Sequence, residues 1–125
     1  MILTLLQVAL GGAIGASLRF GVSLWMLRGP APGFPLGVMT VNVLGSFLMG
    51  VVMVLSVQRG IAHLNPFLMT GLLGGFTTFS TFSLEAFTLV ERGQVLAAGA
   101  YVGLTVGLSL AAFALAVWLS RGVLA

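Results

Sequence analysis

Residues 74–83 read Gly-Gly-Phe-Thr-Thr-Phe-Ser-Thr-Phe-Ser and lie inside a longer run of apolar residues. Of the seven residues from 77 to 83, five carry a hydroxyl group and two are Phe. Two adjacent Gly followed by two Thr have low helix propensity, and the hydroxyl groups compete for backbone hydrogen bonds. We therefore expect a helix that enters this stretch to break within it. The alternative is that these Ser and Thr side chains bond back to their own helix.

The rest of the chain has the composition of a membrane protein. It has 125 residues, of which 59% are hydrophobic and 6% are charged, and its mean hydropathy is +1.20. An ordinary soluble domain has about 25% charged residues, so this composition excludes a soluble enzyme and a disordered chain. The length is that of one small domain. We expect residues 1–125 to form a single transmembrane domain.

Charged residues leave four long uncharged stretches, at residues 1–18, 29–58, 60–84 and 93–120. Because a transmembrane helix needs about 20 mostly apolar residues, we predict an all-α membrane protein with four transmembrane helices. Their predicted bounds are about 2–27, 34–58, 65–91 and 94–119, with the break near mid-membrane in the third helix. The first linker, residues 28–33, has two Pro and two Gly, which end helices. No Lys or Arg precedes the first apolar run, so we expect it to remain as a helix and not to be a cleaved signal peptide.

The Arg residues are divided almost evenly between the two sides of the predicted bundle. Arg59 and Arg121 fall on the side of the N-terminus, and Arg28 and Arg92 on the other side, to which Arg19 is nearer. Since positive loops stay in the cytoplasm, so small a bias is compatible with insertion in both orientations and an antiparallel homodimer. The alternative is one weakly preferred orientation. The net charge of +3 is too dispersed for a nucleic-acid-binding patch.

A broken helix inside a membrane is tolerated only where it is buried or lines a water or ion site. Carbonyl oxygens freed at the break suit a small cation, whereas hydroxyl groups and the N–H groups of a helix N-terminus suit an anion. Phe79 and Phe82 are three residues apart, on one helix face. Because the edge of a Phe ring is electropositive, we expect this pair to face the polar side. Ordinary packing against lipid or core is the alternative.

Single polar residues in the other predicted helices are further candidates, because polar groups in a membrane are costly. Asn42, in the second helix, either faces an ion or forms a hydrogen bond to a neighbouring helix. Arg19, in the first helix, either raises the anion concentration at a vestibule or extends to the interface. Glu85 lies one turn beyond Thr81 and is either an acceptor for its hydroxyl or an interfacial residue.

The fourth predicted helix combines a polar stripe with a glycine repeat. Its polar residues recur at i, i+4 and i+8: Tyr101, Thr105 and Ser109. Gly99, Gly103 and Gly107 form two overlapping GxxxG motifs, which predict close packing against another helix.

Three motifs, taken together, resemble the CrcB/Fluc family of fluoride channels. They are residues 11–20 (Gly-Gly-Ala-Ile-Gly-Ala-Ser-Leu-Arg-Phe), 41–47 (Val-Asn-Val-Leu-Gly-Ser-Phe) and 74–83. The resemblance covers all four predicted helices. It implies a dual-topology homodimer of two antiparallel subunits with two parallel fluoride pores, in the cell (inner) membrane of a prokaryote. Phe20 departs from the family, which often has Tyr at that position.

The resemblance also implies roles for individual residues. It places Arg19 at a vestibule, and it implies a structural sodium ion on the dimer axis, held by the backbone of Gly74 and Thr77. The expected partners are fluoride, a second copy of the chain and membrane lipid, and no nucleic acid. The residues expected along the fluoride pore are Asn42, Phe79, Ser80, Thr81, Phe82, Glu85, Tyr101, Thr105 and Ser109.

The implied function is passive export of fluoride, which lowers its toxicity in the cytoplasm. Catalysis is not expected, because the chain has no Cys and one His and offers neither a nucleophile–base pair nor a set of transition-metal ligands. One alternative is a proton-coupled small multidrug exporter, which would need a membrane-buried carboxylate in the first helix, where the only charge is Arg19. Another is a structural subunit of a membrane complex, which would have no need for five hydroxyl groups at mid-membrane.

Overall fold

The computed structural model describes residues 1–27, 29 and 33–124. Within that part every regular element is a helix, and four segments are long and apolar enough to span a membrane, as the sequence predicts. The predicted linker residues 28 and 30–32 lie outside the described residues. The elements are α1 (Ile2–Met26), α2 (Leu36–Gln58), η1 (Ala62–Leu64), η2 (Pro66–Leu73), α3 (Gly74–Phe76), α4 (Phe79–Glu91) and α5 (Val95–Leu124).

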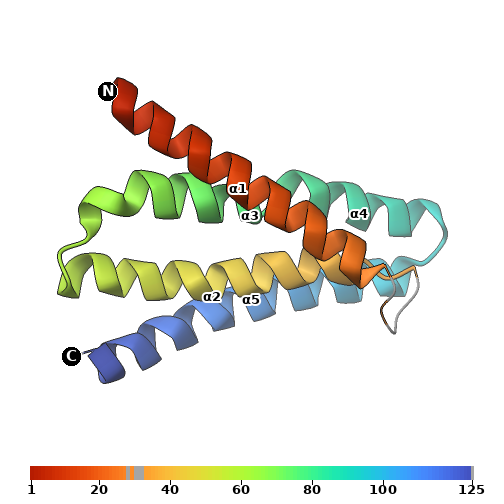
Figure 1. The fold of residues 1–125 in the computed structure, drawn as a ribbon. Helices are drawn as coiled ribbons and strands as arrows, with labels where there is room; N and C mark the ends of the chain where they lie inside the picture. Colours follow the sequence, from red (N-terminus) through yellow and green to blue (C-terminus); the bar gives the residue numbers. More distant parts are fainter. Residues whose placement is uncertain (28, 30–32, 125) are drawn as a thin grey trace.

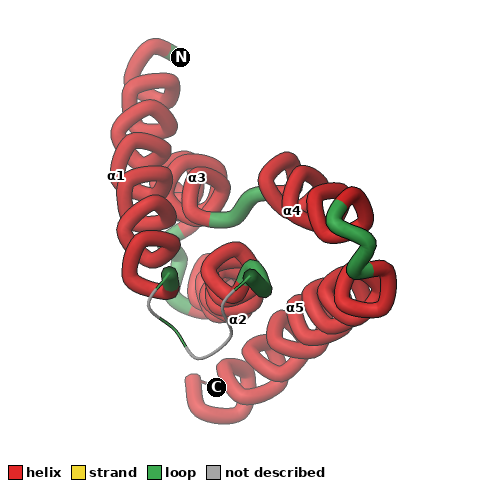
Figure 2. Tube along the Cα trace, turned by 90° about the vertical axis from the view of Figure 1, so that its right-hand side faces the viewer, coloured by secondary structure: helices red, strands yellow, loops and turns green. Residues whose placement is uncertain are grey.

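The four long segments run back and forth, so both termini lie at the same end of the bundle (Figure 1). Seen end-on, α2 lies in the middle of the bundle, with α1 and α3 on one side and α5 on the other (Figure 2). The largest contact of α2 is with α5. The buried core joins α2, α4 and α5 through Val38, Met39, Phe82, Leu89, Ala98 and Tyr101.

The third membrane-capable segment is not one continuous α-helix. It begins at Pro66, at a position where the missing N–H of Pro costs no hydrogen bond, and its first part, η2, is a π-helix that the sequence does not predict. The helical backbone is interrupted at Thr77 (φ −85°, ψ 158°) and Thr78 (φ −153°, ψ 123°). Thr78 then caps α4, because its hydroxyl accepts a hydrogen bond from the N–H of Thr81 at 3.1 Å.

The interruption divides this segment between two partners. The part before it, η2 and α3, packs against α1, and α4 packs against α5. Glycines allow the first of these contacts: a Cβ atom at Gly15 would lie 2.8 Å from the backbone nitrogen of Phe76, and one at Gly75 would lie 2.8 Å from the carbonyl oxygen of Gly12. The 11–20 motif is therefore the surface on which the first half of the third segment rests.

The last helix differs from its prediction in two respects. It continues through Arg121 to Leu124, past the expected end at 119, because a positive side chain in the last turn of a helix is favourable. Gly99, Gly103 and Gly107 were expected to pack closely, but among the described residues no atom would lie within 4 Å of a Cβ at these positions. The glycine repeat therefore lies on the open face of α5.

Candidate functional site

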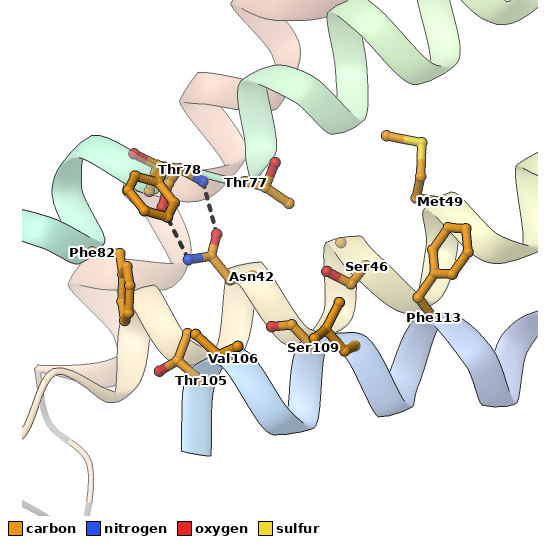
Figure 3. Close-up of a pocket in the computed structure, with 13 residues that line it drawn as sticks. Asn42, Ser46, Met49, Thr77, Thr78, Phe82, Thr105, Val106, Ser109 and Phe113 are labelled. Atoms are coloured by element: carbon orange, nitrogen blue, oxygen red, sulfur yellow. Dashed lines mark hydrogen bonds between the residues drawn. The ribbon is translucent and has the colours of Figure 1, made fainter. Parts of the chain in front are cut away.

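A cavity of about 360 Å³ lies between α2, the interruption at 77–78, α4 and α5 (Figure 3). Of the described residues that line it, none is charged. Its polar lining consists of Asn42, Ser46, Thr77, Thr78, Thr105 and Ser109, and its apolar lining includes Met49, Phe79, Phe82 and Phe113. The cavity thus brings together three widely separated parts of the chain that the sequence singles out: the second helix, the 74–83 stretch and the polar stripe of the fourth helix.

Asn42 holds the interruption in place. Its Nδ2 donates to the carbonyl oxygen of Thr78 at 3.0 Å, and its Oδ1 accepts from the N–H of Thr78 at 2.7 Å (Figure 3). The side-chain amide therefore pairs with the extended backbone of Thr78 as a neighbouring strand would, and it satisfies both polar groups of one residue that has left the helix. The amide lies in the cavity wall, and its oxygen and one of its two N–H groups are engaged by the backbone of a neighbouring segment, which was one of the two alternatives predicted for Asn42.

The polar stripe of α5 presents unpaired hydroxyl groups. The oxygens of Tyr101, Thr105 and Ser109 are buried, and no described residue forms a hydrogen bond with any of them. Thr105 and Ser109 line the cavity, and Tyr101 precedes them by one turn on the same face. An unpaired buried hydroxyl costs about 1–3 kcal/mol, so a row of them is unfavourable unless a ligand or water completes it. Such hydroxyls supply O–H donors to an anion.

Phe79 and Phe82, which were predicted to face a pore, both line the cavity, but their surroundings differ. Their ring centroids are 5.6 Å apart with an interplanar angle of 65°, an edge-to-face arrangement in which the edge of one ring meets the face of the other. Phe82 is 7% exposed and belongs to the core, whereas Phe79 is 78% exposed. Phe82 fixes one wall of the cavity, and Phe79 forms its open side.

Four residues predicted to line the pore lie outside this cavity: Tyr101 of α5 and three residues of α4. Ser80 is exposed, with its hydroxyl 3.4 Å from that of Thr78. Thr81 is half-buried and contributes its backbone N–H to the cap of α4. Glu85 lines a second cavity instead. The positions of these three α4 residues outside the cavity follow from the register of α4, in which Phe79 and Phe82 occupy the cavity-facing positions.

Arg19 contacts the backbone just before the interruption. Its Nε donates to the carbonyl oxygen of Gly75 at 3.1 Å in a partly buried contact. A cation at the carbonyl end of a helix is stabilising, because the last carbonyl groups lack intrahelical partners. This geometry gives Arg19 a capping contact that the sequence does not predict, in addition to any vestibule role.

The backbone at the interruption has carbonyl oxygens that suit a cation. Because the N–H of Thr78 is bonded to Asn42, the carbonyl of Gly74 loses its normal helical donor. Within the described residues no hydrogen bond reaches the carbonyl oxygens of Gly74 or Thr77. The described residues hold no group of three or more His, Cys, Asp or Glu that could bind a metal. The available donor set is therefore neutral carbonyl oxygen, which fits a monovalent ion without charge-matching carboxylates.

Some residues that line the cavity are not among the predicted ones. Ser46 follows Asn42 by four residues on α2, and Phe113 follows Ser109 by four residues on α5. Helical spacing from a predicted residue would have identified both of them. Thr78 lies in the 74–83 stretch but was not assigned a role, and Met49 carries no polar signal.

Comparisons with known proteins point to one family. Residues 6–117 match the family model described as CrcB-like protein, Camphor Resistance (CrcB). The chain is 58% identical over 125 residues to a protein of Ruegeria sp. (strain TM1040), with 99% of each chain covered. It is 54% identical over 122 residues to one of Roseobacter denitrificans, covering 96% of this chain and 97% of the relative. It is 62% identical over 111 residues to one of Cereibacter sphaeroides (strain ATCC 17029), covering 89% of each chain. Each of these relatives is named fluoride-specific ion channel FluC.

Proposed function

Because this chain belongs to the CrcB-like protein family, we propose that it is a channel that conducts fluoride passively out of the cell. It is a multi-pass membrane protein and a transporter, not an enzyme. The observation that carries the proposal is a cavity with no charged residue in its described lining, faced by hydroxyl groups of α5 that no described residue pairs and by the rings of Phe79 and Phe82. Hydroxyl donors and positive ring edges recognise a small anion.

The same lining explains how an ion could leave as well as enter. Conduction requires binding that is strong enough to replace water but weak enough to release the ion. An Arg or Lys in the cavity would hold fluoride tightly, and none of the described lining residues is charged. Thr105 and Ser109 lie one turn apart and provide successive donors along α5, so the ion can be passed from one weak site to the next.

The proposed unit is an antiparallel homodimer in the inner membrane of a prokaryote, with the interruption at 77–78 near mid-membrane. Its support lies in the even division of Arg between the two sides of the bundle and in the high exposure of Phe79, which a second copy would cover. Two copies of the interruption meeting on the two-fold axis would bring together the carbonyl oxygens of Gly74 and Thr77. A sodium ion there would be structural, because it would satisfy these oxygens without lying in either pore.

The proposal is tested by fluoride efflux from liposomes that contain the purified protein, measured with a fluoride electrode after valinomycin opens a path for potassium. We expect fluoride to leave at a rate set by the electrical gradient, without a proton gradient. Efflux that requires an imposed proton gradient would instead indicate a coupled exporter. Absence of fluoride flux from a folded, reconstituted protein would favour a structural subunit and contradict the channel.

A further inference from the structure

A second cavity of about 270 Å³ opens at the end of the bundle where α1 ends and α2 begins. Among the described residues, its polar lining consists of Ser23 of α1, Glu85 of α4 and Arg92, which directly follows α4, and Phe34 and Val38 are among its apolar residues. None of these residues lines the first cavity. A guanidinium and a hydroxyl group are donors to a small anion, and the carboxylate of Glu85 opposes tight anion binding.

The two cavities are stacked along the same two helices. On α2, Val38 lines the second cavity and Asn42, one turn later, lines the first. On α4, Phe82 lines the first cavity and Glu85, three residues later, lines the second. A helical turn advances by about 5.4 Å, so only one layer of side chains separates the two spaces.

That layer is aromatic. Tyr101 is fully buried, and its ring centroid lies 5.2 Å from that of Phe82, in the wall of the first cavity. On its other side it lies 5.7 Å from the ring centroid of Phe34, in the wall of the second cavity, with the planes at 89°. Phe34 is anchored at the start of α2, where its carbonyl oxygen accepts a hydrogen bond from the N–H of Leu36 at 2.8 Å.

We propose that the second cavity is the mouth of the conduction path at this end of the bundle, and that the Phe34–Tyr101 pair is the constriction between this mouth and the first cavity. The inference rests on the proposed fluoride conduction. The ion enters between Ser23 and Arg92 and crosses the aromatic layer beside the Tyr101 hydroxyl, which is buried and unpaired among the described residues. It then reaches Thr105 and Ser109. Because Arg92 and Glu85 carry opposite charges, the mouth binds fluoride weakly and does not trap it.

The absence of Cys from the chain allows a direct test. Ser23→Cys places a thiol in the mouth, and Trp25→Cys places one on the same helix, on a residue that is 74% exposed and does not line the cavity. Both variants are reconstituted and treated on both sides of the membrane with the anionic reagent 2-sulfonatoethyl methanethiosulfonate. Flux is compared with that of the same untreated variant, and labelling is measured by mass spectrometry.

We expect labelled Ser23→Cys to lose fluoride flux by about tenfold or more, because a negative charge at a mouth lowers the local anion concentration, and labelled Trp25→Cys to keep its flux. Unchanged flux in fully labelled Ser23→Cys, or an equal loss in both variants, would overturn the proposal. Neither of these two outcomes contradicts the proposed function, because the unmodified chain still conducts.

A second variant tests the constriction. Phe34→Ala removes the ring that faces Tyr101 and is expected to raise fluoride flux, with exposed Phe20→Ala as the matched control that keeps the parental rate. Flux of Phe34→Ala equal to or below the parental rate, in protein that elutes like the parent on size exclusion, would contradict the constriction.

Discussion

At the scale of single residues, the site depends on how backbone groups at the interruption are satisfied. Asn42 pairs with both polar groups of Thr78, and Arg19 pairs with the carbonyl of Gly75. The carbonyls of Gly74 and Thr77 are left without a hydrogen bond among the described residues. Two side chains from different helices thus decide which carbonyl oxygens remain without a hydrogen bond among the described residues, and Asn42 also forms part of the cavity wall.

The aromatic pair allows a residue-scale prediction. Replacing Phe79 or Phe82 with Ile removes the positive ring edge but keeps an apolar side chain, so each variant is expected to lose fluoride flux in the liposome assay. Phe82→Ile should also lower the melting temperature, because Phe82 is buried and packs on Tyr101, whereas exposed Phe79→Ile should melt like the parent.

Phe87→Ile is the matched control, because Phe87 lies on the same helix, is exposed and does not line the cavity. It should conduct like the parent. Parental flux in both Phe79→Ile and Phe82→Ile would assign the pair to packing alone and remove it from the conduction path.

The sequence predicted which polar residues share a helix face better than it predicted what they contact. The spacing of Tyr101, Thr105 and Ser109 placed them on one face, because helical periodicity is local. The partners of Asn42 and Arg19 are backbone groups about 36 and 56 residues away in the chain, and no local pattern encodes such a contact. Ser80, Thr81 and Glu85 were assigned to the pore by resemblance; the register of α4 places all three outside the first cavity, and Glu85 lines the second cavity.

At the scale of helical elements, the interruption at 77–78 allows one membrane-capable segment to pack on two partners. The glycines of α1 bring its backbone against η2 and α3, and α4 is free to follow α5. The residues that interrupt the helix lie in the stretch that the sequence singles out for low helix propensity. The sequence of Pro66–Leu73 carries no comparable signal for a π-helix. This segment packs against α1, which is a separate part of the chain.

This packing predicts different outcomes for two glycines three residues apart. A Cβ at Gly15 would meet the carbonyl oxygen of Leu72 and the nitrogen of Phe76, both backbone atoms that cannot move aside cheaply. Gly15→Ala should therefore cost about 1–3 kcal/mol of stability, measured as a lower melting temperature in detergent. Gly12→Ala should be nearly neutral, because the nearest atom to its Cβ would be 4.0 Å away. Equal melting temperatures for both variants would contradict the close contact at Gly15.

At the scale of the whole molecule, one chain leaves much of its apolar surface and the open side of its cavity uncovered. Phe79 is exposed, and among the described residues no atom from another helix would lie within 4 Å of a Cβ at the glycine repeat of α5. The proposed dimer and its central sodium ion would cover part of this surface. The folding of a single copy determines neither the dimer nor the ion. For the same reason, composition and loop charges alone leave open whether the chain inserts in both orientations or in one.

The proposed sodium ion predicts a dependence of the dimer on sodium that is separate from conduction. Exhaustive exchange of sodium for N-methyl-D-glucamine, at equal ionic strength, should lower both the melting temperature of the dimer and fluoride flux, because each carbonyl oxygen left unsatisfied in a membrane costs several kcal/mol. Return of sodium should restore both. If neither quantity changes after exchange, the carbonyls of Gly74 and Thr77 are satisfied in another way and the ion is not part of the structure.

The proposed dual topology predicts that neither orientation works alone. Glu91→Lys with Gln94→Lys adds positive charge at one end of the bundle, and Gln58→Lys with His63→Lys adds it at the other; all four positions are exposed. Because positive loops stay in the cytoplasm, each double variant should insert in one orientation and fail to protect cells from fluoride. Co-expression of the two variants should restore resistance, since only then do antiparallel partners exist. Full resistance from either double variant alone would indicate a parallel or monomeric channel.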